Sequence, residues 1–150
     1  MVLKNEHAER SLCPIACGLD VIGDHWTLIL IRDLLLFGKH EFREFLESEE
    51  GISSNILSDR LQRLQKCGLI KFIYHPNNRR RKLYYLTPQG KDLAPVLAAI
   101  FIWYAKHAQH QADIHQYLSE RKLFTSNDFI QYTQTLSSGW EQSYGIEDNH

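Results

Sequence analysis

Residues 51–90, GISSNILSDRLQRLQKCGLIKFIYHPNNRRRKLYYLTPQG, decide how this 150-residue chain folds. Ser53 or Ser54 suits the N-cap of a helix, and Gly68 suits the stop of the same helix. Between them, three leucines spaced i, i+4 and i+7 form a stripe that faces a core: Leu57, Leu61 and Leu64. Two β-rich runs follow, LIKFIYH and RRRKLYYLT, and Pro-Asn-Asn separates them. The stretch therefore predicts a helix and then a hairpin with a basic tip.

The sequence before this stretch predicts three more helices. Pro14 suits the first position of a short helix, which Gly23 ends. Asp24 is an N-cap for HWTLILIRDLLLFG, which ends at Gly38. Because this segment is apolar on nearly all sides, we expect it to form the buried centre of the fold. A third helix of about two turns is predicted in EFREFLES, residues 41–48.

The sequence after the hairpin predicts a long helix that starts at Thr87-Pro88, and we expect Pro95 to kink it by removing one backbone donor. Beyond His107 the chain is polar, and QADIHQYLSERK and SNDFIQYTQTL are each predicted to be helical. The last residues, SGWEQSYGIEDNH, are expected to fray. The predicted fold class is mainly α with a small β-hairpin (α+β), in a single domain over residues 1–150.

Charge is divided unevenly along the chain. Residues 51–91 hold nine Lys and Arg against one acid, Asp59, which is an excess of eight positive charges. The other 109 residues hold eight bases and 17 acids, an excess of nine negative charges. One face of such a protein attracts polyanions, as in nucleic-acid-binding proteins. An ordinary solvated surface is the alternative explanation of a charge run.

Several classes of protein are disfavoured. The longest apolar run, residues 26–37, is interrupted by Arg32 and Asp33 and is shorter than the roughly 20 residues that span a bilayer. The polar N-terminus lacks the apolar centre of a secretory signal, and three cysteines do not indicate a disulfide framework. We therefore expect a cytoplasmic protein with no membrane partner. The motifs GxxxxGK[ST], GxGxxG, HExxH and GxSxG are missing from the sequence, so neither an enzyme nor a cofactor is predicted.

The order of the predicted elements is that of a winged helix-turn-helix. The major groove of B-DNA admits one α-helix, whose N-terminal side chains reach the bases. We predict that the helix after the acidic loop reads double-stranded DNA through Ser53, Ser54, Asn55, Ser58, Asp59, Gln62 and Arg63. The hairpin tip is predicted to contact the phosphate backbone or the adjacent minor groove through Asn78, Arg79, Arg80, Arg81 and Lys82.

Two details of this interface stay open at the level of sequence. Asp59 either accepts a hydrogen bond from a cytosine amine or orients Arg63 through an i, i+4 pair, which we favour. The hairpin carries four aromatic residues: Phe72, Tyr74, Tyr84 and Tyr85. They either stack on bases or pack in the core, and we favour packing in the core.

Several short motifs lie between residue 13 and about residue 104: Cys-Pro at Cys13, Ile-Gly-x-x-Trp at residues 22–26, Gly-Ile-Ser at 51–53, Arg-Leu-x-x-Leu at 60–64, Gly-Leu-Ile at 68–70 and Tyr-x-Leu-Thr-x-x-Gly at 84–90. With these motifs the chain resembles the HxlR family of bacterial winged-helix transcriptional regulators. The resemblance implies a homodimer, formed through the terminal helices, that binds a palindromic operator and represses or activates nearby genes. Residues 105–150 form a C-terminal helical extension that the resemblance does not account for.

An apolar set in the long helix after Pro88 supports a dimer independently: Leu97, Ile100, Phe101, Trp103 and Tyr104. Exposed apolar patches of this kind usually mark an interface. The alternative is that the C-terminal helices fold back and cover the stripe within one chain. In a dimer, paired recognition helices reach half-sites about one helical turn, roughly 34 Å, apart.

Cys13 starts the first helix, where the helix dipole lowers a thiol pKa, and in some relatives of such families a cysteine at this position senses oxidants or electrophiles. A buried structural cysteine is the alternative. Cys17 is either a resolving partner or, as we favour, a packing residue, and Cys67 is expected to be structural. His107, His110 and His115 lack a cysteine or acidic partner at ligand spacing, so no metal site is predicted.

The sequence therefore predicts a homodimeric, sequence-specific DNA-binding transcriptional regulator that acts as a repressor. Oxidants or electrophiles sensed through Cys13 are the candidate effectors, and the sequence does not identify another. The alternative is a winged-helix protein-interaction module without specific DNA binding, because a fold does not fix a function.

Overall fold

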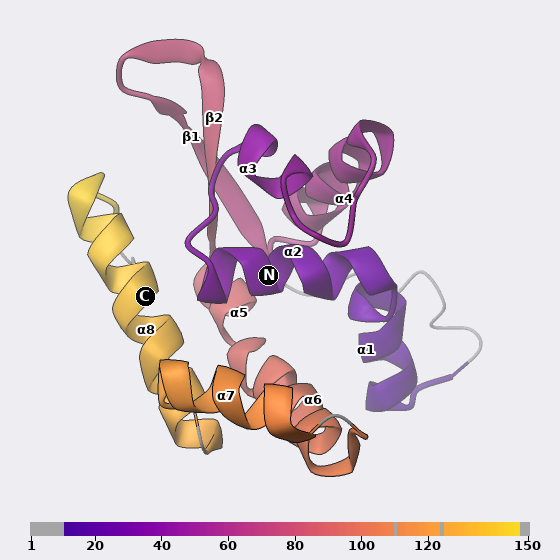
Figure 1. Ribbon diagram of the computed structural model, residues 1–150. Coiled ribbons are helices and arrows are strands. Elements are labelled where there is room, and N and C mark those ends of the chain that lie inside the picture. Colours follow the sequence, from indigo (N-terminus) through magenta and orange to yellow (C-terminus); the bar gives the residue numbers. More distant parts are fainter. Residues whose placement is uncertain (1–10, 110, 124, 148–150) are drawn as a thin grey trace. The chain divides into compact units, whose positions relative to one another are not determined.

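The computed structural model describes residues 11–109, 111–123 and 125–147, and in these residues it contains eight helices and one two-stranded antiparallel sheet (Figure 1). The fold class is mainly α with a β-hairpin, as predicted. The backbone forms two compact units, residues 1–91 and residues 92–150. The single domain over residues 1–150 stays a prediction, and each unit is described by itself below.

The first unit contains the helix-turn-helix and the hairpin. Its elements are α1 (Pro14–Ile22), α2 (His25–Leu36), α3 (Phe42–Leu46), α4 (Ser54–Lys66), β1 (Ile70–His75), β2 (Asn78–Leu86) and α5 (Pro88–Lys91). The predicted caps are confirmed: the Asp24 carboxylate accepts from the Thr27 N–H at 3.2 Å, and the Ser53 hydroxyl accepts from the Ile56 N–H at 3.3 Å. Gly23 follows α1 as its C-cap.

The core of this unit is formed by the elements that the leucine pattern indicated. Leu30 and Ile31 of α2 are fully buried, which confirms α2 as the central helix. The predicted α4 stripe is buried as well: Leu57, Leu61 and Leu64. The other elements add Phe45 from α3, Ile70 from β1, and Leu83, Tyr84 and Leu86 from β2. Each such side chain contributes roughly 2 kcal/mol by leaving water. The polar face of α4 is left at the surface.

The hairpin is joined to the helices by a short extended segment that the sequence analysis did not predict. Glu41 forms a β-bridge with Leu83, and the Tyr84 N–H donates to the His40 carbonyl at 2.8 Å. A second hydrogen bond joins the same two residues, in which Nδ1 of the His40 ring donates to the Tyr84 carbonyl at 2.7 Å. In Figure 1 α3 lies between α4 and the hairpin, whose tip projects beyond the helices. The hairpin is therefore fixed to the start of α3 by backbone bonds.

The aromatic side chains of the hairpin divide between core and surface. Tyr84 is buried, and its ring lies 6.3 Å from Phe45 and 6.0 Å from Phe72. Phe72 and Tyr85 are partly buried, whereas Tyr74 is 54% exposed. The favoured packing in the core is thus confirmed for Tyr84 and is wrong for Tyr74. Tyr74 shares the ribbon face of Phe72 and Tyr84, but it lies nearer the hairpin tip, opposite Lys82.

A buried carboxylate connects α2 to the turn between α3 and α4. Asp33 is fully buried and accepts from the Ser48 hydroxyl at 2.5 Å and from Arg32 Nε at 3.0 Å. The Lys39 ammonium lies 3.6 Å from Asp33 and donates to Ser48 at 2.7 Å. Buried charges need partners of this kind, because water no longer solvates them. Asp33 therefore fixes the turn that sets the position of α4.

Arg32 extends this network to the end of the turn. Its guanidinium donates to Glu50, and this hydrogen bond is the main cause that lowers the pKa of Glu50 to about 2. Burial by itself lowers the pKa of Arg32, but the bonds to Glu50 and Asp33 outweigh it and raise that pKa above its ordinary value. Gly51, the next residue, has φ +70°, which permits the sharp turn into α4.

The base of the hairpin is closed by the Tyr-x-Leu-Thr-x-x-Gly motif. The Thr87 hydroxyl donates to the Gly68 carbonyl at 2.6 Å and accepts from the Gly90 N–H at 3.1 Å. A Cβ on Gly90 would lie 2.1 Å from the Leu69 carbonyl oxygen, so no other residue fits there without moving the backbone. The motif fastens α5 across the end of α4.

The second unit consists of α6 (Ala94–His107), α7 (Gln111–Arg121) and α8 (Ser126–Ser143). The Phe101 ring of α6 lies 5.9 Å from Tyr117 of α7 and 5.8 Å from Phe129 of α8. The two predicted helices in the polar C-terminal segment are therefore confirmed, and both pack on α6.

Two sequence predictions for this part of the chain are wrong. The helix after Pro88 is not one kinked helix: α5 ends at Lys91, and Pro95 lies in the first turn of α6, where a proline needs no N–H donor. Residues 138–143 do not fray but continue α8, whose end is supported by the Trp140 and Tyr144 rings, 4.7 Å apart at i, i+4. Residues 148–150 lie outside the described residues.

No single helix in the described residues has both the length and the apolar composition needed to cross a membrane. The α1–α2 pair meets those two criteria only when joined, and it is bent by 76° at its break.

The network around Asp33 predicts a specific loss of stability. Replacing Asp33→Asn removes the carboxylate that pairs with Lys39 and leaves Arg32 with Glu50 alone, so the free energy of unfolding, measured by urea denaturation at pH 7, is expected to fall by about 3 kcal/mol. Glu47→Gln is the matched control, since it removes only the exposed Arg43–Glu47 pair and is expected to cost less than about 0.5 kcal/mol. Equal losses in the two variants would contradict the role given to Asp33.

Candidate nucleic-acid interface

The N-terminal half of α4 presents a polar surface built from short side chains. Six of the residues predicted to read DNA are exposed: Ser53, Ser54, Asn55, Ser58, Asp59 and Gln62. The leucine stripe on the opposite side of the same helix is buried, so the 3.6-residue period itself turns these side chains outward. Short side chains allow a helix axis to approach the floor of a groove closely.

Arg63, the seventh predicted residue, is turned differently. It is partly buried, and its guanidinium donates to the Asp20 carbonyl near the end of α1. The predicted Asp59–Arg63 pair is wrong, because Asp59 accepts from the neighbouring Arg60 instead. Arg63 therefore connects α4 to α1.

Arg60 is a positioning residue that the sequence analysis missed. Its Nε donates to the Asp24 carboxylate at 2.8 Å, and Asp24 is also the N-cap of α2. Partial burial raises the pKa of Asp24, but the bonds from Thr27 and Arg60 outweigh this and lower it below its ordinary value. Asp24 had been assigned only a local role, and nothing in the spacing of residues 24 and 60 signals their contact. The pair fixes α4 against the start of α2.

The cations of the hairpin fall into two groups. Arg79 and Arg80 are exposed, and within the described residues neither forms an ion pair with a carboxylate. Arg81 is held by Glu41, which accepts from Arg81 Nε at 2.8 Å and from a second guanidinium nitrogen. The Lys82 ammonium lies 4.3 Å from the centre of the Phe72 ring. Arg79 and Arg80 are thus exposed without a carboxylate partner among the described residues, whereas Arg81 and Lys82 each have a partner.

Asn78 has a local role at the start of β2. Its side-chain oxygen accepts from the Arg80 N–H at 3.0 Å. This bond shapes the backbone that carries Arg79 and Arg80. A contact of Asn78 itself with DNA stays a prediction.

Cys13 lies at the N-cap of α1 and is exposed. The backbone N–H groups of Ala16 and Ile15 lower the pKa of its thiol below the ordinary value. Cys17 is partly buried, with its thiol 3.5 Å from the Ser11 carbonyl, and Cys67 is the partly buried C-cap of α4. The alternative of a buried, structural Cys13 is therefore not what the structure shows.

No group of three metal-ligating side chains occurs in the described residues. His110, one of the three histidines considered for a metal site, lies outside those residues.

The apolar set proposed for dimer formation is only partly covered. Ile100, Trp103 and Tyr104 are 47%, 64% and 61% exposed, whereas Leu97 and Phe101 are partly buried. The alternative was that the C-terminal helices cover this stripe within one chain. Among the aromatic residues of α6, they cover Phe101 alone. A second apolar surface, at the start of the chain, was missed: Leu12, Ile15 and Leu19 are 87%, 74% and 58% exposed. Their helical spacing was visible in the sequence.

Comparison with known proteins places these features in context. The profile of the HxlR-like helix-turn-helix family matches residues 21–112. The HTH-type transcriptional regulator sll1512 of Synechocystis sp. is 30% identical over 89 residues, which are 59% of this chain and 65% of that protein. About a third of that relative therefore lies outside the match.

Two solved structures are similar to the structure described above. The crystal structure of PA1607 superimposes with a TM-score of 0.62 and 34% identity, covering 68% of this chain and 70% of that one. The redox regulator HypR in its oxidized form gives a TM-score of 0.57 and 28% identity, covering 65% of this chain and 99% of that one.

Proposed function

The chain belongs to the HxlR-like helix-turn-helix family, and from this premise we propose that it is a homodimeric repressor that binds a palindromic operator in double-stranded DNA. In this proposal α4 enters the major groove and the hairpin lies on the adjacent phosphate backbone. The observation that carries it is the exposed polar face of α4 beside two unpaired arginines on a projecting hairpin. The protein acts in the cytoplasm as a regulator and not as an enzyme.

The start of α4 supplies both attraction and specificity. Its first backbone N–H groups form the positive end of the helix dipole, which favours a nearby phosphate. Asn55 is the residue on this face best suited to read a base, since its amide pairs with adenine through two hydrogen bonds. Ser54 and Ser58 are small enough to leave room for that contact.

A protein-interaction module without DNA binding is less well supported. Such a module would be expected to present acids or bulky apolar side chains on the groove face of α4. The one acid there, Asp59, accepts from Arg60, which also pairs with Asp24, and the exposed apolar residue is Ile56, at 36%. The surface therefore fits a polyanion better than an apolar partner.

Removing the two unpaired hairpin arginines tests the backbone contact. Arg79→Ala with Arg80→Ala is expected to weaken binding to every duplex and to lower the slope of log affinity against log salt by about two, because each phosphate contact contributes about one. Arg81 is left unchanged in this variant, because it is already paired with Glu41 and is not expected to add a phosphate contact. The measurement is fluorescence anisotropy at several salt concentrations.

Asn55→Ala is the control for this experiment, because it is expected to change sequence preference and not the salt slope. The loss should be roughly 1 to 3 kcal/mol on the preferred site and much less on random DNA. An unchanged slope in the double variant, or an equal loss on random DNA with Asn55→Ala, would contradict the assigned roles.

The dimer is proposed to form through the exposed apolar surfaces of α6 and α1. Trp103→Ser with Tyr104→Ser is expected to shift the protein from dimer to monomer in analytical ultracentrifugation and to weaken binding to a full palindrome more than to a half-site. Tyr74→Ser is the control, since Tyr74 is also more than half exposed but lies on the hairpin. A monomeric wild-type protein, or a dimer that survives the double substitution and Ile15→Ser, would overturn this part.

We further propose that Cys13 senses peroxides. Its thiol is exposed, and the lowered pKa raises the share of the thiolate, which is the form that reacts. The Cys13 thiols of the two protomers would lose two electrons and two protons to one hydroperoxide, ROOH, giving one disulfide, ROH and water. Such a bond between protomers would change the spacing of the two recognition helices.

Hydrogen peroxide is therefore expected to produce a covalent dimer on a non-reducing gel and to change operator affinity at least several-fold. Cys13→Ser should abolish both effects, and Cys67→Ser should preserve both. Cross-linking that persists in Cys13→Ser, or a wild-type operator affinity that peroxide does not change, would disprove the sensing role. Neither result would affect the proposal of DNA binding.

A further inference from the structure

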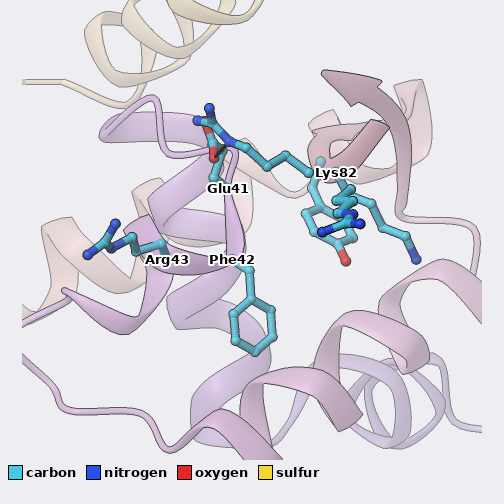
Figure 2. A pocket seen from close by; sticks show the side chains of 7 residues that line it. Glu41, Phe42, Arg43 and Lys82 are labelled. Atoms are coloured by element: carbon cyan, nitrogen blue, oxygen red, sulfur yellow. Dashed lines mark hydrogen bonds and ion pairs between the residues drawn. The ribbon is translucent and has the colours of Figure 1, made fainter. Parts of the chain in front are cut away.

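A hollow of about 640 Å³ lies between α3 and the hairpin. It belongs entirely to the first unit, and seven residues line it (Figure 2). Phe42 and Arg43 line it from α3, and Lys82 lines it from β2, as Figure 2 shows. Its volume is in the range of pockets that hold small organic molecules, roughly 300 to 1,000 Å³.

The wall of the hollow combines aromatic rings with cations. Phe42 is partly buried, and the buried Tyr84 ring packs against Phe45 and Phe72. Burial also raises the pKa of the Tyr84 phenol, which therefore stays neutral and does not repel an anion. Cationic side chains surround these rings: Arg43, Arg80, Arg81 and Lys82.

The charges of this wall are only partly balanced. Glu41 is the one acid among the lining residues, and Arg81 occupies it with two hydrogen bonds. Arg43 makes only a loose, exposed pair with Glu47, at 3.9 Å, and Arg80 is not ion-paired within the described residues. The net excess of cations favours a ligand that carries negative charge.

We propose that this hollow binds a planar aromatic carboxylate of two or more fused rings, with the rings on Phe42 and Tyr84 and the carboxylate on Arg80 and Lys82. A guanidinium pairs with a carboxylate through two parallel hydrogen bonds, which gives direction as well as charge. The hollow has room for more than a single ring, and the proposal therefore names a fused ring system. The aromatic wall also distinguishes the site from a simple phosphate contact, which needs cations alone.

The regulatory consequence rests on the proposed function. Arg80 is also one of the two unpaired arginines assigned to the phosphate backbone. A carboxylate that occupies Arg80 withdraws it from DNA, so ligand and duplex each weaken the binding of the other. At 0.15 M salt, each phosphate contact that is lost lowers duplex affinity about fivefold.

The probe for this site is 1-naphthoate, titrated into the full chain without DNA by isothermal calorimetry. The expected result is saturable binding that Arg80→Gln weakens about fivefold and that Phe42→Leu also weakens. Arg79→Gln is the matched control, because it removes the same charge from the neighbouring residue, which does not line the hollow. The neutral 1-naphthamide and the non-aromatic acetate should each bind more weakly than 1-naphthoate.

A second arm measures duplex affinity with and without saturating 1-naphthoate, where a drop of about fivefold is expected for the wild type and none for Arg80→Gln. No calorimetric binding, or equal weakening by Arg79→Gln and Arg80→Gln, would overturn the proposal. A wild-type protein that binds 1-naphthoate but no duplex would refute the proposed function and leave the ligand site standing.

Discussion

The fully buried Asp33 carboxylate is the constraint on which the arrangement of the first unit depends. It lies on the central helix, yet its partners include Ser48 in the turn between α3 and α4. A hydrophobic core alone tolerates small shifts of a packed helix, whereas a buried charge with several hydrogen-bond partners permits only one register. Asp33 therefore sets where α4 begins, and the Asp24–Arg60 bond fixes the side that α4 turns outward.

Pairing also divides the arginines of the hairpin into two groups. Arg81 is paired with Glu41 at the start of α3, so this ion pair helps to fix the hairpin to the helices. Arg79 and Arg80 lie nearer the tip and carry their full charge into solvent. A positive tip on a backbone that is fixed at its base attracts a polyanion without losing much entropy when it binds. One basic run is thus divided into a paired arginine at its base and two exposed arginines nearer the tip.

Much of the fold follows from local pattern, and most of the departures follow from long-range pairing. The leucine stripe of α4, the Asp24 and Ser53 caps and the hairpin were predictable, because a helical period and a turn are encoded within a few neighbouring residues. The Glu41–Arg81 and Asp24–Arg60 pairs were not, since both join residues that are far apart in the sequence. The break before Pro95 was a local signal that was misread, since proline suits a first turn.

Chemical footprinting on a duplex selected from genomic fragments tests most directly whether α4 reads the major groove while the hairpin holds the backbone. Dimethyl sulfate reports guanine N7 in the major groove, and hydroxyl radicals report the sugar-phosphate backbone. The account predicts two protected N7 segments about one helical turn apart, flanked by backbone protection that disappears when the two unpaired arginines are replaced. Tight binding with guanine N7 fully reactive in both segments would contradict it.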